Sequence, residues 1–165
     1  MNFPKFSSIL KDINKIIQAD QIFFYASYTL PSNKKYKDSI ATEAVFYKQV
    51  KETPNLIFYK GHRSPTSGKE KGVDVHLAVD IIKHCFQNKC DQVIIMSGDA
   101  DLSYPLEVAK DIGKETRAIF LPNRFSLGIS HQASSSFVLN YKNRFQPTRQ
   151  DIPNSLKVIK TKDPA

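Results

Sequence analysis

The chain has 165 residues, the length of a single domain, and 41% of them are hydrophobic, which is enough for one ordinary core. Its 6 glycines, 9 prolines and 2 cysteines are unexceptional, so collagen-like, disordered and disulfide-scaffold proteins are disfavoured. A formal net charge of +8 permits a polyanionic partner held through phosphate contacts, and a well-solvated basic surface is the alternative explanation of the same excess.

Helical and strand patterns alternate along the first half of the chain. Some stretches carry apolar residues at helical spacing, and others are β-branched and aromatic runs of strand length. In chain order they predict a helix over 6–19, a strand over 22–28, a helix that Asp38 or Ser39 caps and that Pro54 and Asn55 end, a strand over 56–59, and an exposed basic loop over 61–72.

The same alternation continues in the second half. The patterns predict a helix over 74–88 with a core stripe of Val75, Ala78, Val79, Ile82 and Phe86, a strand over 93–96, a helix with Pro105 in its first turn and Gly113 at its end, a strand over 116–121, a loop or weak helix over 124–133, and a strand over 136–139. The run Val93 to Met96 is apolar throughout, as expected of a central strand covered by helices on both faces.

Alternating helices and strands predict a three-layer α/β/α domain with a mostly parallel sheet, because right-handed crossovers place helices on both faces. We expect this domain to occupy residues 1–141 and a basic, extended C-terminal tail to occupy residues 142–165. Ligands of such folds bind at the carboxyl ends of the strands.

Neither a membrane segment nor a secretory signal is visible, so we expect a cytoplasmic protein with no membrane partner. Cys85 and Cys90 are expected to be free thiols, because both fall near the end of one predicted helix. Zinc binding by these cysteines and His84 is a weaker alternative, since a second ligand cluster is missing.

The segment Ser97-Gly98-Asp99-Ala100-Asp101 directly follows the apolar strand. Two aspartates two residues apart can face one cation, and their oxygen atoms suit hard metals such as Mg²⁺ and Mn²⁺. The alternative is that these aspartates only cap the helix that follows. Such a pair is also found in phosphatases and glycosyltransferases.

Two stretches together closely resemble the signatures of the NYN domain family, which has a PIN-like, Rossmann-like fold and includes LabA-like proteins. The first is Lys71-Gly72-Val73-Asp74 followed by Leu77-Ala78-Val79-Asp80. The second runs from Ile95 to Leu102 and continues with Pro105-Leu106. The resemblance is strong over Lys71 to Phe120 and implies a metal-dependent ribonuclease.

By this resemblance, Asp74, Asp99 and Asp101 are catalytic residues that hold Mg²⁺ or Mn²⁺, and Ser97 is the hydroxyl residue beside them. Asp80 also matches a recurrent family position. Six residues of helix turn Asp80 about 120° away from Asp74. It is therefore a supporting residue that orients a neighbour or a metal-bound water, or else a structural helix aspartate.

Arg63, Lys69 and Lys71 are candidate contacts to the phosphates of single-stranded or structured RNA, with solvated loop residues as the alternative. Tyr25 and Tyr28 lie at the end of a predicted strand, on the same rim of the domain as these basic residues. They could stack on RNA bases, but we favour a role in packing.

Family members begin with a central strand that carries the motif Asp-Gly-x-Asn, whereas this sequence begins Met1-Asn2-Phe3. We expect Asn2 to be the remnant of that motif, a supporting residue, and a further strand to be encoded upstream. The missing strand and its aspartate would impair activity.

The leading hypothesis is therefore a metal-dependent endoribonuclease. A non-catalytic NYN regulator or nucleic-acid-binding module is the alternative, favoured by the absent first strand. A phosphatase-type hydrolase is more remote, because no convincing nucleophile is visible. The sequence leaves open whether the chain forms a homodimer.

Overall fold

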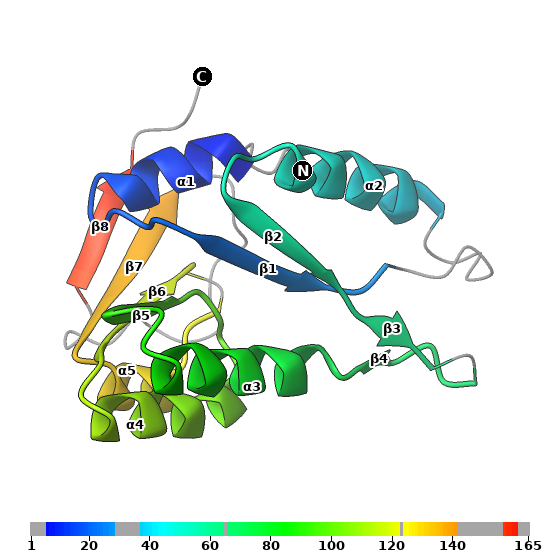
Figure 1. Cartoon of the computed structure of the whole chain (residues 1–165). Helices are drawn as coiled ribbons and strands as arrows, with labels where there is room; N and C mark the ends of the chain where they lie inside the picture. Colours follow the sequence, from blue (N-terminus) through cyan, green and yellow to red (C-terminus); the bar gives the residue numbers. More distant parts are fainter. Residues whose placement is uncertain (1–5, 29–36, 65, 123, 142–156, 162–165) are drawn as a thin grey trace. The chain divides into compact units, whose positions relative to one another are not determined.

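A computed structural model describes residues 6–28, 37–64, 66–122, 124–141 and 157–161 of the chain (Figure 1). The described residues divide into two compact units, one up to residue 77 and one from residue 78 onward. Among them, no helix combines the length and apolarity that crossing a bilayer requires.

The first unit is built around two parallel strands. Its elements are α1 (Phe6–Asn14), β1 (Ile22–Ala26), α2 (Lys37–Lys51), β2 (Leu56–Lys60), β3 (His62–Arg63) and β4 (Glu70–Lys71). β1 and β2 pair in parallel, with Ile22 opposite Leu56 and Ala26 opposite Lys60. Parallel strands need a long crossover, and α2 lies in the segment that provides it. Because α2 begins at Lys37, Asp38 lies inside its first turn and is not the expected cap.

Aromatic packing joins α1 and α2 to one face of the β1–β2 pair. The Phe24 ring lies 5.5 Å from Phe6 and 6.1 Å from Phe46, both edge to face, and stacks on Phe58 at 5.6 Å. Figure 1 shows both helices on the same side of these strands. Since side chains alternate along a strand, Tyr25 is directed to the opposite face.

The segment predicted as a basic loop over 61–72 contains a short hairpin. β3 and β4 pair antiparallel, with Arg63 opposite Glu70. Gly68 has a φ of +65°, the left-handed region that favours glycine, and its carbonyl oxygen accepts a hydrogen bond of 3.1 Å from Arg63 Nη1. The hairpin escaped prediction because strands of two residues each carry no periodic pattern.

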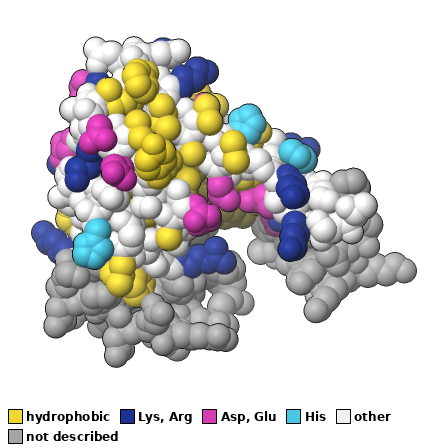
Figure 2. Space-filling model, turned by 90° about the horizontal axis from the view of Figure 1, so that it is seen from below, with side chains coloured by type: hydrophobic (Ala, Val, Ile, Leu, Met, Phe, Trp, Pro, Cys, Tyr) yellow, Lys and Arg dark blue, Asp and Glu magenta, His cyan; other side chains and the backbone are white. Residues whose placement is uncertain are grey.

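Helix α3 (Val73–Phe86) begins in the first unit and ends in the second. Its predicted core stripe is wrong in part, because Val75, Val79 and Phe86 are 65%, 55% and 69% exposed. Figure 2 shows exposed hydrophobic side chains in yellow. Helical spacing tells which side chains share a face, but it does not tell whether that face is covered.

The second unit carries a four-stranded parallel sheet in the order β5-β6-β7-β8. Besides most of α3, its elements are β5 (Gln92–Ile95), η2 (Ala100–Leu102), α4 (Ser103–Asp111), β6 (Glu115–Phe120), α5 (Leu127–Gln132), β7 (Ser135–Tyr141) and β8 (Lys157–Thr161). α4 and α5 contact each other and β6. Ile119 and Phe120 of β6 and Leu139 of β7 are almost fully buried and mark the core.

Two expectations for this sheet differ from the structure. β5, predicted to be central, is an edge strand of the described sheet, and Met96 just after it is 41% exposed. A continuous apolar run indicates burial of both faces but does not reveal neighbouring strands. β8 lies within the predicted tail and joins the sheet beside β7, which the sequence did not suggest.

The prediction of an α/β fold with mostly parallel strands is confirmed. Every pairing between named strands is parallel except that of β3 with β4. Pro105 lies in the first turn of α4, and Gly113 follows its end with a φ of +82°. The further upstream strand stays a prediction.

The two cysteines are both free thiols. Cys85, on α3, is 2% exposed, whereas Cys90, beyond the helix, is half-buried. Burial, and to a lesser extent the neighbouring Cys90, raises the pKa of the Cys85 thiol to about 11. Cys85 is therefore protonated across the neutral range.

We expect iodoacetamide near neutral pH to alkylate Cys90 well before Cys85, because the thiolate is the reactive form and Cys85 is both protonated and buried. Peptide mass spectrometry over a time course measures the two rates, with urea-unfolded protein as the control in which both residues react. Equal rates in the folded protein would contradict the described burial of Cys85.

Candidate functional site

The acidic segment, Ser97–Asp101, leaves the carboxyl end of β5 as predicted. β5 pairs in parallel with β6, with Ile95 opposite Ala118. The loops that follow these two strands therefore emerge at the same edge of the sheet, the usual place for ligands in parallel α/β folds.

Hydrogen bonds within the acidic segment fix its shape. The Asp99 backbone N–H donates to Ser97 Oγ at 3.2 Å, and the Asp101 N–H donates to Asp99 Oδ1 at 3.1 Å. Asp99 is thus the N-cap of η2. Asp99 therefore does act as a cap, but a carboxylate has about four acceptor positions, and one capping hydrogen bond leaves others open to a ligand.

Two contacts hold the acidic segment in place: a buried residue that follows it, and a second loop that lies against it. Leu102 is 2% exposed and anchors its end in the core. A Cβ atom added to Gly98 would lie 3.1 Å from the Arg124 Cβ atom and 3.2 Å from its carbonyl carbon. The loop after β6 therefore lies directly against the loop after β5.

Arg124 is an exposed residue that lies next to the acidic segment, and the sequence analysis did not identify it. Its position after a neighbouring parallel strand was the available signal. It lay within a stretch predicted only as loop or weak helix.

The donor chemistry of the acidic segment suits a hard cation. Asp99 and Asp101 are exposed, and in the described part of the chain neither takes part in an ion pair with a basic side chain. Ser97 adds a hydroxyl oxygen. Mg²⁺ and Mn²⁺ favour such oxygen ligands. Within the described ranges, however, no group of three or more His, Cys, Asp or Glu side chains is gathered as a metal site.

The other predicted acidic residues lie elsewhere. Asp74 is exposed in the first turn of α3, where a carboxylate complements the positive end of the helix dipole, and it belongs to the first unit. Asp80 is half-buried on the same helix, in the second unit. The structure thus joins Ser97, Asp99 and Asp101 in one segment. Asn2 lies outside the described residues.

The predicted RNA contacts occupy the β3–β4 hairpin. Lys69 and Lys71 are exposed, in keeping with either phosphate binding or solvation. Arg63 is half-buried and donates to the Gly68 carbonyl oxygen. Its geometry favours bracing of the hairpin over contact with a ligand.

A hydrogen-bonded polar cluster links the hairpin to Ser27, which directly follows β1, and no sequence pattern predicted it. Ser27 is 1% exposed and donates a hydrogen bond to Glu70 Oε2, between the two hairpin lysines. The Tyr47 hydroxyl donates to the Ser27 carbonyl oxygen at 3.4 Å. Burial, followed by the negative charges of Glu43 and Glu70, raises the pKa of Tyr47 to about 12. The hydrogen bond from Ser27 thus holds the hairpin residue that lies between Lys69 and Lys71.

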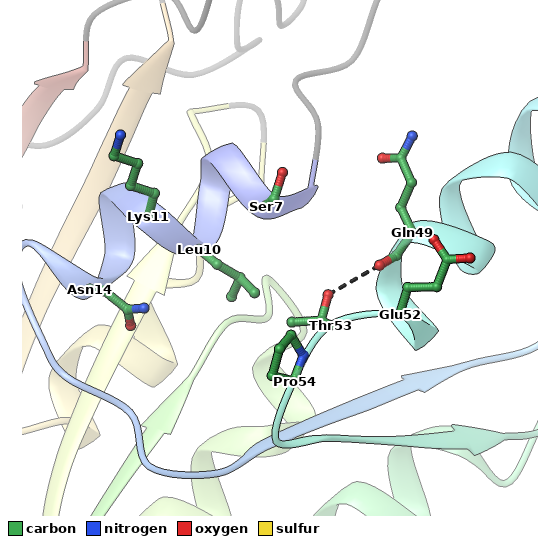
Figure 3. Close-up of a pocket in the computed structure, with 8 residues that line it drawn as sticks. All are labelled: Ser7, Leu10, Lys11, Asn14, Gln49, Glu52, Thr53 and Pro54. Carbon is green, nitrogen blue, oxygen red and sulfur yellow. Dashed lines mark hydrogen bonds between the residues drawn. The ribbon is translucent and has the colours of Figure 1, made fainter.

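A groove of about 670 Å³ lies in the first unit between α1 and the end of α2 (Figure 3). Thr53 Oγ1 donates to the Gln49 carbonyl oxygen at 3.1 Å. The groove is lined by Ser7, Leu10, Lys11, Asn14, Gln49, Glu52, Thr53 and Pro54. A single carboxylate among mostly neutral side chains does not match a hard-cation site.

Comparison with known families gives one match. The model of the NYN domain matches residues 2–141, which include the acidic segment, α3 and the hairpin. Neither a curated protein nor a solved structure matches the chain.

We expect Gly98→Ala to lower the free energy of unfolding by about 1–3 kcal/mol, the usual cost of overpacking, because the added methyl group presses on the Arg124 backbone. Gly128→Ala, in α5, is the matched control, since its Cβ atom would meet Ser126, Ala100 and Ser103 only at ordinary contact distances of 3.7 Å or more. Thermal or urea unfolding of the two variants measures the difference. A Gly98→Ala protein as stable as Gly128→Ala would show that the two loops are not in close contact.

Proposed function

The chain belongs to the NYN domain family, a PIN-like family whose members are generally nucleases, and we propose on this premise that it is a metal-dependent endoribonuclease. Its parallel sheets and helices agree with the α/β/α fold of that family.

The observation that carries the proposal is the acidic segment at the carboxyl end of β5. Two exposed carboxylates, Asp99 and Asp101, and the Ser97 hydroxyl occupy the place where parallel α/β folds bind ligands. The family-like sequence around Asp74 supplies a third carboxylate, which we propose as a further ligand on the strength of the motif.

The residues divide into two roles in this proposal. Asp74, Asp99 and Asp101 hold Mg²⁺ or Mn²⁺, which when bound supplies an activated water and stabilises charge on the cleaved phosphodiester. Ser97 and the η2 cap fix the direction of Asp99. Asp80 supports the site through a neighbour.

The basic residues hold the substrate without taking part in the chemistry. Lys69 and Lys71, on a hairpin anchored by Ser27, contact phosphates of the RNA strand. Phosphate contacts position a strand but carry no base information. RNA is the substrate that we propose, in keeping with the formal net charge of +8.

A non-catalytic, nucleic-acid-binding NYN module is the second candidate. It is favoured by the absence, within the ranges described, of three gathered metal-binding side chains. Such a module would bind RNA with the same basic residues but would leave it intact in Mg²⁺ or Mn²⁺. Cleavage by highly purified protein separates the two candidates.

We expect Asp99→Asn to reduce RNA cleavage by about 10²-fold or more, the scale seen when one charge-stabilising group is removed from an active site. Asparagine keeps a side-chain oxygen for the η2 cap, so the fold should survive. Asp74→Asn should have a similar effect. The assay is cleavage of labelled single-stranded RNA with Mn²⁺ or Mg²⁺, and chelator should abolish it.

Asp111→Asn, at the exposed end of α4, removes the same charge and should leave the rate unchanged. Full activity of Asp99→Asn would place the chemistry elsewhere. A folded wild-type protein that binds RNA but cuts none would favour the non-catalytic module.

A further inference from the structure

Two lysine side chains converge on one aromatic ring in the first unit. Lys51 Nζ lies 5.1 Å from the centroid of the Tyr28 ring and 4.8 Å from that of Phe58. Lys60 Nζ lies 4.9 Å from the Tyr28 centroid. We call these four residues, Tyr28, Lys51, Phe58 and Lys60, the Tyr28 patch.

Strand pairing explains why these residues meet. Lys60 is the last residue of β2 and lies opposite Ala26, the last residue of β1. Tyr28 follows β1 by two residues, and Lys51 is the last residue of α2. Tyr28 and Lys60 therefore lie at the carboxyl end of the parallel pair, the edge at which such folds bind ligands, and the long side chain of Lys51 reaches the Tyr28 hydroxyl from the end of α2.

Aromatic contacts hold both ammonium groups in place. Lys51 also donates a hydrogen bond of 2.5 Å to the Tyr28 hydroxyl. The Tyr28 ring itself is fixed edge to face against Tyr47 at 4.9 Å. An attractive cation–π contact lowers the freedom of a lysine side chain, so less entropy is lost when that lysine binds a ligand.

The two lysines of the Tyr28 patch form no direct ion pair within the described part of the chain, although the carboxylates of Glu43 and Glu70 act on the neighbouring Tyr47. The nearby Glu52 lies 3.9 Å from Lys48 instead. Two like charges held beside one ring attract an anion that can contact both. Phosphate groups on a nucleic acid strand have this character.

We infer that the Tyr28 patch is a second phosphate-binding point for RNA, outside the acidic segment and the β3–β4 hairpin. The inference depends on RNA being the proposed substrate, and it adds a contact that the family-like motifs do not contain. The contact is sequence-independent, because ammonium groups read phosphate charge and not base edges.

The test compares a variant that loses two positive charges from the Tyr28 patch with a control variant that loses two positive charges from other helices. Lys51→Gln with Lys60→Gln is compared with Lys83→Gln and Lys110→Gln, exposed lysines of α3 and α4. The probe is fluorescein-labelled oligouridine of about 12 nucleotides. Fluorescence anisotropy is measured in chelator, so that no RNA is cut, over a range of salt concentrations.

We expect the patch variant to bind roughly tenfold more weakly at about 0.1 M salt and to lower the slope of log Kd against log salt by about 1.4, since each phosphate contact on a single strand contributes about 0.7. The control variant should keep the wild-type slope. Thermal unfolding confirms that both variants are folded.

The ring is tested separately. Tyr28→Leu removes both the ring beside which the Lys60 ammonium group lies and the hydroxyl that accepts the hydrogen bond from Lys51, and it should weaken binding about threefold. Tyr28→Phe keeps the ring and loses only the hydroxyl contact with Lys51, so it should bind more tightly than Tyr28→Leu.

Two outcomes overturn the inference: a patch variant with the wild-type slope, or a loss no larger than that of the control. Binding of wild type to anionic lipid vesicles but not to oligouridine would overturn it as well. Failure of the nuclease proposal is distinguishable, because a protein that binds oligouridine through the Tyr28 patch but cuts no RNA in Mn²⁺ supports the inference alone.

Discussion

Parallel strand pairing is the constraint on which the rest of the structure depends, because it brings the carboxyl ends of neighbouring strands to one edge. In the second unit, β5 and β6 pair in this way, and Gly98 after one strand consequently lies against Arg124 after the other. In the first unit, pairing of β1 with β2 sets Ala26 opposite Lys60 and so brings Lys60 beside Tyr28. Both proposed sites follow from this one arrangement.

The two units present different chemistry at these edges. At its edge, the first unit has the ammonium groups of Lys51 and Lys60 beside the Tyr28 ring. It also has a hairpin whose Glu70 accepts a hydrogen bond from the buried Ser27. The second offers the carboxylates of Asp99 and Asp101 on a capped and packed segment. In the function that we propose, the former hold RNA phosphates and the latter hold the cation that promotes hydrolysis.

Local patterns predicted the α/β class, the parallel strands and the position of the acidic segment, because alternation of helix and strand is written in consecutive residues. The order of strands across a sheet cannot be read from consecutive residues. For this reason the sequence predicts β5 to be central, although it is an edge strand of the described sheet. β8 and the hairpin carry too few residues or too polar a sequence to stand out. The contact of Lys51 with Tyr28 joins positions 23 residues apart, a separation that no local pattern reports.

Paramagnetic broadening of backbone amide signals by Mn²⁺ tests the metal-binding claim most directly, because the amides nearest the ion lose their signals first. The account predicts that substoichiometric Mn²⁺ broadens the amides of Asp99 and Asp101 together with that of Asp74, and that Mg²⁺ competes with this effect. Broadening that leaves the acidic segment untouched, or that spreads evenly over the surface carboxylates, would contradict it.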